Sequence, residues 1–382
     1  MEHILSLLPA HQSLFLIRKC LYIPKFMHIF RSSSFFKNNE FISKIQDKFK
    51  IFLEKILNIN LNSFNWSLAQ LPSKLGGLDF FPLNLLSLSS FVSSRLSNNS
   101  IISGFICPTD RLLDDAIDKW KANTPINTVL PSIITHKNFF TPLISKYQTD
   151  ISVNPPLDCI QLLQLSDRLG GHEWLESLPS RNLGNLLSDE QLRVTIGLRL
   201  GCDIVQPHAC VKCKSPVDSK GRHGLNCIFS QGRHQRHSAV NHIINRSLTA
   251  AHIPNNLEPS NLSQVDGLRP DGMTTIPWAL GKSLIWDYTC VSSFPSNINF
   301  NLITQAEIKK INKYKNFKNF LFTPVVTSTN GHFSPSTFLF LKNLANKIRL
   351  FTNEPREFLF IRQKIQIEIF RHNYGSFLGT QL

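Results

Sequence analysis

Residues 269–289 read RPDGMTTIPWALGKSLIWDYT, and this stretch decides the fold of the C-terminal part of the chain. Two short apolar runs flank Ala279-Leu280-Gly281, a pattern that predicts an antiparallel β-hairpin. In a hairpin centred near Ala279, Asp271 and Asp287 lie directly opposite each other, with side chains on one face roughly 5 Å apart. Two carboxylates this close repel unless a cation lies between them. We therefore expect a site for Mg2+ or Mn2+, a hard cation that can activate water against a phosphodiester.

Both aspartates also have ordinary structural interpretations. Asp271 follows a proline and could be a turn residue, and Asp287 could cap a segment or pair with Arg269. The apolar run around Asp287 favours a functional role, because an unpaired carboxylate buried in a strand costs free energy. Glu258 and Glu307 are weaker candidates for a further metal-linked carboxylate.

The helix expected over 302–317 supplies a candidate lysine. Lys310 lies on the apolar stripe of this helix, where a lysine either extends its amine to solvent or pairs with buried carboxylates. Asp271 and Asp287 are the obvious partners, and a cation there would help phosphodiester cleavage. The alternative is a solvated basic helix that contacts nucleic-acid backbone. Thr289 shares the face of Asp287 and could donate to a metal-bound water.

Residues 210–227, CVKCKSPVDSKGRHGLNC, have the spacing C-x2-C-x9-H-x3-C. Three thiolates and one imidazole on short loops are typical ligands of tetrahedral zinc, and Gly221 and Gly224 are expected to supply tight turns. The predicted ligands are Cys210, Cys213, His223 and Cys227. Cys202, His208 and His234 lie close enough in sequence to replace one of them. A closed site of this kind stabilises the fold without doing chemistry; the alternative is a set of buried thiols beside a surface histidine.

The composition favours a polyanionic partner. The 382 residues include 41 Lys and Arg against 26 Asp and Glu, a net charge of +15, which favours DNA or RNA, although basic charge can also serve solubility alone. No apolar run approaches the length of a membrane span, so we expect a soluble intracellular protein without membrane contact. Eight cysteines in a chain this long are too few for a disulfide scaffold.

Hydrophobic periodicity predicts an α+β protein. The order helix, strand, hairpin, helix, strand is expected over 234–251, 258–262, 273–291, 302–317 and 320–327, followed by helices near 335–351 and 355–374. Residues 258–262 are expected to form either a short strand or an extended approach to the hairpin. The expected domains are a helical region over 1–100, a linker with helices over 101–187, a helix plus zinc knuckle over 188–233, and a mixed α/β domain over 234–382.

Several motifs together resemble the C-terminal end of non-LTR retrotransposon polyproteins. They are the Cys-Cys-His-Cys knuckle, GR-x-x-RH-x-x-x-N (Gly232, Arg233, Arg236, His237, Asn241), RPD (269–271), Asp287, and K-x-x-K-Y (Lys310, Lys313, Tyr314). The phrases LIRKCLYIPKFMHIFR and LAQLPSKLGGLDF in residues 1–100 are similar to the thumb and connector that follow a reverse transcriptase palm. The resemblance covers most of the chain, with 110–180 the least characteristic part.

This resemblance implies a restriction-like endonuclease of the PD-(D/E)XK class that nicks target DNA so that reverse transcription can start there. It implies catalytic roles for Asp271, Asp287 and Lys310, with the two aspartates binding Mg2+. The implied partners are DNA, element RNA and a separate reverse transcriptase, and the implied location is the nucleus. Phosphate contacts are expected from Arg233, Arg236, His237, Arg269, Lys313, Lys315 and Lys318.

The chain departs from this family in two places. The polymerase palm is absent, since Asp114-Asp115 lies in a helical context, so we expect no polymerase activity from this chain alone. The usual E-x-K reads Asp287-Tyr288-Thr289, so Lys310 would have to supply the lysine from the following helix. Because the resemblance begins inside the thumb, a truncated element copy or an incomplete gene is also expected.

Two other hypotheses follow from the sequence. The first is a binding module without catalysis, a decayed or co-opted remnant that holds nucleic acid through charge and the zinc knuckle; it predicts salt-sensitive binding and no cleavage. The second is a protein-interaction module built on the N-terminal helices. A short distance between Lys310 and the two aspartates would favour the nuclease.

Overall fold

The structure, a computed structural model, describes residues 2–98, 111–163, 169–260, 262, 268–294 and 302–381. The chain divides into two units. The first comprises Met1–Leu163 with Leu200–Cys202, and the second comprises Gln164–Arg199 with Asp203–Leu382. The expected boundary near residue 100 is therefore replaced by one near residue 163, and the knuckle and the mixed α/β region fall in one unit.

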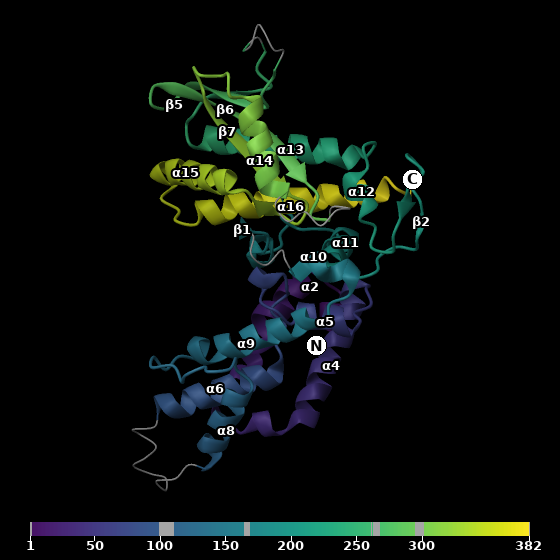
Figure 1. Ribbon diagram of the computed structural model, residues 1–382, viewed down its shortest axis with the longest axis vertical. Helices are drawn as coiled ribbons and strands as arrows, with labels where there is room; N and C mark the ends of the chain where they lie inside the picture. The colour runs from purple at the N-terminus through teal and green to yellow at the C-terminus, as the bar shows by residue number, and fades with distance from the viewer. Residues whose placement is uncertain are drawn as a thin grey trace. The chain divides into compact units, whose positions relative to one another are not determined.

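The first unit is helical (Figure 1). A core of Phe36, Phe91, Trp120, Phe139 and Leu143 joins its elements, and the Trp120 indole donates to the Phe139 carbonyl over 2.8 Å. Residues 111–153 therefore belong to a packed core, which corrects the expected linker. Its α-helices are α1 (Glu2–Leu5), α2 (Ala10–Leu16), α3 (Ile23–Ser32), α4 (Asn39–Leu57), α5 (Ser63–Ala69), α6 (Leu83–Ser97), α8 (Arg111–Ala122), α9 (His136–Val153) and α10 (Ile160–Leu163).

The second unit is built on a six-stranded mixed sheet in the order β1-β8-β7-β6-β5-β4. The hairpin strands are antiparallel, and β6 runs parallel to β7, so the chain crosses over between them through a helix. The strands are β1 (Leu169–Gly170), β4 (Asn255–Leu257), β5 (Gly272–Ala279), β6 (Lys282–Val291), β7 (Leu321–Ser328) and β8 (His332–Phe333). The fold class is thus α+β, as predicted.

Helices cover both faces of this sheet. Because side chains alternate along a strand, the neighbours Ile285 and Trp286 of β6 point to opposite faces. Ile285 packs on Tyr314 and Phe317, which follow α14 (Leu302–Lys313), whereas the Trp286 indole bonds to Asn241 of α13 (Gln231–Ala250). Two further helices, α15 (Pro335–Thr352) and α16 (Glu357–Leu378), pack with α13 (Figure 1). The hairpin therefore lies in the middle layer, between α13 and α14.

Most element boundaries in the second unit follow the sequence. A capping box at Ser188 begins α11 (Asp189–Leu200), because the Gln191 N–H bonds to the Ser188 hydroxyl and the Ser188 N–H bonds to the Gln191 side chain. One strand was misplaced: the strand before the hairpin is Asn255–Leu257, and Glu258 lies beyond its end in a left-handed conformation (φ 48°).

No helix in the described part of the chain is both long and apolar enough to cross a membrane.

Candidate functional site

The hairpin places Asp271 and Asp287 opposite each other. The register pairs Gly272 with Trp286, and the Asp271 N–H bonds to the Trp286 carbonyl over 2.9 Å. The two-residue turn is Leu280-Gly281, both with positive φ, so it lies just beyond the predicted centre. Two register shifts in β5 compensate for this offset and return the aspartates to opposed positions. The predicted juxtaposition is therefore present, although the symmetric hairpin behind the prediction is not.

The aspartates meet a histidine from α13. Ligand atoms of His237, Asp271 and Asp287 all lie within 4.8 Å of one another, and His237 Nε2 lies 3.0 Å from Asp271 Oδ2. The same Oδ2 accepts the Tyr288 N–H over 2.6 Å. Burial alone would raise the pKa of Asp271, but the hydrogen bond from His237 and the other donors lower it below its usual value. The carboxylate is thus held ionised inside a largely buried site.

Two lysines of α14 complete the cluster. Lys310 Nζ lies 2.5 Å from Asp287 Oδ1, and Lys313 Nζ lies 3.1 Å from Asp287 Oδ2. Asp287 is only 4% exposed, so these ammonium groups supply the pairing that a buried carboxylate requires. Lys310 is therefore paired with Asp287, one of its two predicted partners. Lys313, expected to contact phosphate, instead shares Asp287 with it.

Tyr314 fixes the end of α14 against the RPD segment. Its hydroxyl donates to the Arg269 carbonyl over 3.0 Å, its ring stacks on Phe322, and burial raises its pKa above the usual range. Lys313 Nζ lies 4.8 Å from the centre of the same ring. Tyr314 thus ties the helix that bears the lysines to the strand entry that bears Asp271.

The weaker carboxylate candidates lie outside this cluster. Glu258 is exposed and pairs with Arg269 over 2.6 Å, while Glu307 is buried and bonds to the Ser336 hydroxyl. Neither belongs to the group of possible metal ligands among the described residues. Thr289 is partly buried and pairs with Val326 of β7.

A second cluster brings together the four residues of the predicted knuckle. Ligand atoms of Cys210, Cys213, His223 and Cys227 lie within 4.8 Å of one another and could hold a metal ion. Cys213 Sγ lies 3.0 Å from His223 Nε2 and 3.8 Å from Cys227 Sγ. A hydrogen bond from Ser215 lowers the pKa of the Cys213 thiol to about 6, which favours the thiolate that binds metals.

Short elements position these ligands. The first two cysteines lie at the end of a small hairpin of β2 (His208–Ala209) and β3 (Pro216–Val217), and α12 (His223–Asn226) carries the histidine. His208 bonds instead to the Gln206 carbonyl and the Thr380 hydroxyl. Cys202 and His234 are likewise not in the four-residue group found among the described residues. The alternative ligands are thus not the ones assembled.

Two glycines of the knuckle lie against α16. Gly221 has φ +65° and makes a turn, as predicted, and a Cβ there would lie 2.5 Å from the Phe377 ring. Gly224 makes no such turn; a Cβ there would lie 2.7 Å from the Ser376 carbonyl oxygen, so its role is close approach to α16. The knuckle is therefore packed on the C-terminal helix of the same unit, which explains why it is not a separate domain.

The residues expected to contact phosphates have different surroundings. Arg236 is 2% exposed and donates to the Asn373 side chain in α16, so it is a structural residue and the expectation of a phosphate contact is wrong. His237 lies in the aspartate cluster. Arg233, one helical turn before His237, is exposed on the same side of α13. Arg269, Lys315 and Lys318 are exposed as well.

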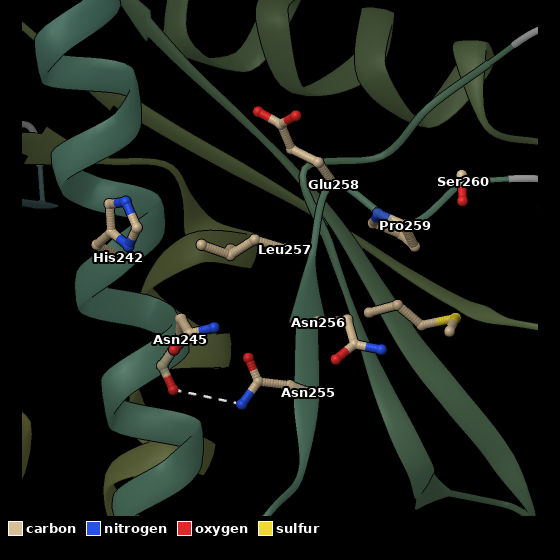
Figure 2. Close-up of a pocket in the computed structure, with 9 residues that line it drawn as sticks. His242, Asn245, Asn255, Asn256, Leu257, Glu258, Pro259 and Ser260 are labelled. Carbon is tan, nitrogen blue, oxygen red and sulfur yellow. Dashed lines mark hydrogen bonds between the residues drawn. The ribbon is translucent and has the colours of Figure 1, made fainter.

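A polar pocket of about 650 Å3 lies between α13 and β4 (Figure 2). Asn245, Asn255 and Asn256 line it, and Glu258 borders it while its N–H bonds to the Asp271 carbonyl. The Asn255 Nδ2 donates to the Asn245 carbonyl, and its buried Oδ1 has no hydrogen-bond partner in the structure. Hydrogen-bonding groups therefore make up much of the lining of this pocket.

Asn241 is a residue of the site that sequence reasoning did not assign. It contacts both the Trp286 indole and the His237 ring, at 3.1 and 3.3 Å. The spacing of Asn241 from His237 could have indicated this contact, since residues four apart on a helix are neighbours.

No protein-family model matches the chain, and a search of curated proteins finds no match.

Proposed function

We propose that the second unit is a metal-dependent DNA endonuclease of the kind found at the C-terminal end of retrotransposon polyproteins. One observation carries the proposal: two aspartates from a predicted hairpin have carboxylates within 4.8 Å of each other, and a lysine of the next helix lies 2.5 Å from one of them. Paired carboxylates with a cation at hand are the groups that metal-assisted phosphodiester hydrolysis requires.

Each residue has a role in this proposal. Asp271 and Asp287 would hold Mg2+, which would supply an activated water and neutralise charge on the phosphate. Lys310 orients the attacking water or stabilises the departing oxyanion. Lys313, which shares Asp287, keeps the carboxylate paired when Lys310 turns to the substrate. His237 holds Asp271 in place from the opposite helix.

The charges of the site support a polyanionic substrate. Asp271 and Asp287 carry two negative charges, and Lys310 and Lys313, which both pair with Asp287, carry two positive ones, so these four side chains balance without a metal. A bound divalent cation would leave an excess of two positive charges, which complements a phosphodiester backbone. The whole chain also carries a net charge of +15, and Arg233 is exposed on the same side of α13 as His237. Both features favour binding of a polyanion.

We further propose that the second cluster binds zinc. Ligands at about 2.3 Å from a tetrahedral zinc have sulfurs about 3.8 Å apart, and the Cys213 and Cys227 sulfurs are 3.8 Å apart. Its donors, three thiols and one imidazole, are those that zinc prefers. The zinc would hold the knuckle on α16 without taking part in chemistry.

Plasmid nicking tests the nuclease. Supercoiled DNA is incubated with the full chain and Mg2+ or Mn2+, and Asp271→Asn and Asp287→Asn are each compared with Glu258→Gln, a matched carboxylate outside the cluster. We expect both aspartate variants to lose at least about a hundredfold in rate and the control to keep wild-type activity. Equal zinc content and circular dichroism establish that all three are folded. Wild-type activity in either aspartate variant overturns the proposal.

A second candidate function is a binding module without catalysis. It is favoured by Thr289 in the position of the usual lysine and by Asp287, whose two oxygens already accept from lysines. This candidate predicts DNA or RNA binding that weakens steeply with salt, and no cleavage with either metal. Binding and nicking measured on the same preparation distinguish the two functions.

A further inference from the structure

The aspartate cluster offers two different metal sites. With His237 as a ligand it has one nitrogen and two carboxylates, a set that suits transition metals such as Ni2+ or Co2+. Without His237 its ligands are all oxygen, a set that suits Mg2+ or Mn2+. The choice depends on which nitrogen of the imidazole carries the proton, because a ring nitrogen that holds a proton cannot bind a metal.

A tryptophan fixes the orientation of Asn241. The Trp286 Nε1–H lies 3.1 Å from Asn241 Oδ1 in the buried layer between β6 and α13. An indole N–H can only donate, so the atom facing it must be the amide oxygen. The amide nitrogen of Asn241 is therefore on the other side, 3.3 Å from His237 Nδ1.

Asn241 in turn fixes the tautomer of His237. An amide nitrogen only donates, so His237 Nδ1 must accept and carries no proton. The proton of the neutral ring is then on Nε2, which lies 3.0 Å from Asp271 Oδ2 and donates to it.

We propose that Trp286 and Asn241 lock His237 as a hydrogen-bond donor to Asp271, so that His237 is a positioning residue and the metal site of the cluster is made of carboxylates alone. The metal part of this inference rests on the proposed function, whereas the tautomer does not. The site then selects hard divalent cations and discriminates against nitrogen-seeking transition metals. Asp271 Oδ2, which accepts from both His237 and Tyr288, is held in a fixed direction.

Nitrogen NMR of the imidazole tests the tautomer. The hydrogen bond to Asp271 raises the pKa of His237 above its ordinary value. Long-range 1H–15N spectra are therefore recorded on the zinc-loaded full chain at increasing pH until the imidazole is neutral, and His237→Gln identifies the signals of His237. We expect a protonated Nε2 and an unprotonated Nδ1. A protonated Nδ1 with an unprotonated Nε2, or an equal mixture, overturns the proposal. Nuclease activity has no part in this measurement, so failure of the proposed function leaves its outcome intact.

The variant Asn241→Asp tests the proposal by reversing the tautomer of His237. A carboxylate facing Nδ1 accepts instead of donating, so the proton moves to Nδ1 and Nε2 becomes available as a ligand. We expect the ratio of Ni2+ to Mn2+ affinity of the zinc-loaded protein to rise by at least about tenfold, and His237→Gln in the same chain to abolish the rise. In the wild-type background, His237→Gln should leave the ratio unchanged within about threefold. A tenfold fall there would show that His237 already binds the metal and would refute the proposal.

Discussion

Lys309 and Lys310 are neighbours on α14 with different surroundings, which makes them a matched pair. Lys309 is exposed, whereas Lys310 lies 2.5 Å from the buried Asp287. We expect Lys310→Met to lower the single-turnover nicking rate by about a hundredfold, as removal of one transition-state donor does. Lys309→Met should change the rate by less than about threefold, through weaker phosphate binding alone. If the two variants are equally active, Lys310 is not part of the chemistry.

The sequence predicted the main residues of the site but not their contacts. Asp271, Asp287 and Lys310 could be found because opposed positions in a hairpin and an apolar stripe on a helix are periodic patterns. Lys313, Arg236 and His237 were all expected to contact phosphate, because sequence shows a positive charge without showing what it faces. Their contacts with Asp287, Asn373 and Asp271 depend on how α13, α14 and α16 pack, which no local pattern encodes.

Burial of His11 makes the first unit sensitive to acid. Burial, with the nearby charge of Arg18, lowers the pKa of His11 to about 3 in the folded chain. The unfolded chain, with a pKa near 6.5, takes up the proton first, so stability is complete above about pH 6.5 and declines as the pH falls toward 3. Between pH 7 and 5 this contribution is about 2 kcal/mol.

Hydrogen exchange of α2 and α4 in denaturant at the two pH values measures this loss. His11→Gln has no titrating group, so the variant should lose about 2 kcal/mol less than wild type between pH 7 and 5. An equal loss in the two proteins would assign the acid sensitivity to other groups.

At the scale of elements, the turn of the hairpin forces Leu280 into a backbone conformation that leucine disfavours. Leu280 and Gly281 both have positive φ, and Leu280 is 89% exposed. A two-residue turn of this kind prefers Asn-Gly, since asparagine tolerates the left-handed region better than leucine. We expect Leu280→Asn to stabilise the second unit by about 0.5–1 kcal/mol, a rise of about 1–4 °C in Tm.

Thermal unfolding followed by tryptophan fluorescence measures this rise, since Trp278 and Trp286 lie in the hairpin. Leu280→Ala is the control, because it removes the exposed side chain without easing the backbone. A rise of equal size in both variants would show that the gain comes from lost apolar surface, and not from the turn.

The same hairpin shows why sequence predicts elements better than registers. Its strands and its opposed aspartates were predicted, but its turn lies beyond the predicted centre at Ala279 and β5 is irregular. At the irregularity the Leu284 N–H bonds to the Thr274 hydroxyl in place of a backbone carbonyl. Whether a side-chain hydroxyl accepts this hydrogen bond in place of a backbone carbonyl depends on how the strand is packed. The alternating sequence pattern alone therefore cannot predict the irregularity.

At the scale of the whole molecule, α16 connects the two sites of the second unit. It packs on α13, which carries His237, and on α12, which carries a knuckle ligand. Gly232 of α13 and Gly224 of α12 both lie close to Ser376 near its C-terminal end. The sequence separated knuckle and α/β domain because it could show two clusters of motifs but not the glycine contacts that join them. Disruption of the knuckle should therefore destabilise α16.

Removal of the metal proposed for the knuckle tests this connection. A chelator, or Cys213→Ser, should lower the Tm of the second unit by at least about 4 °C, since the binding free energy of a structural metal is also folding free energy. Cys290→Ser, a change of cysteine outside the knuckle, should have little effect. Because Gly221 and Gly224 contact Phe377 and Ser376, hydrogen exchange should accelerate first at the C-terminal end of α16. Uniform acceleration along the helix, or an unchanged Tm in the metal-free protein, would show that the knuckle and α16 are not coupled through the metal.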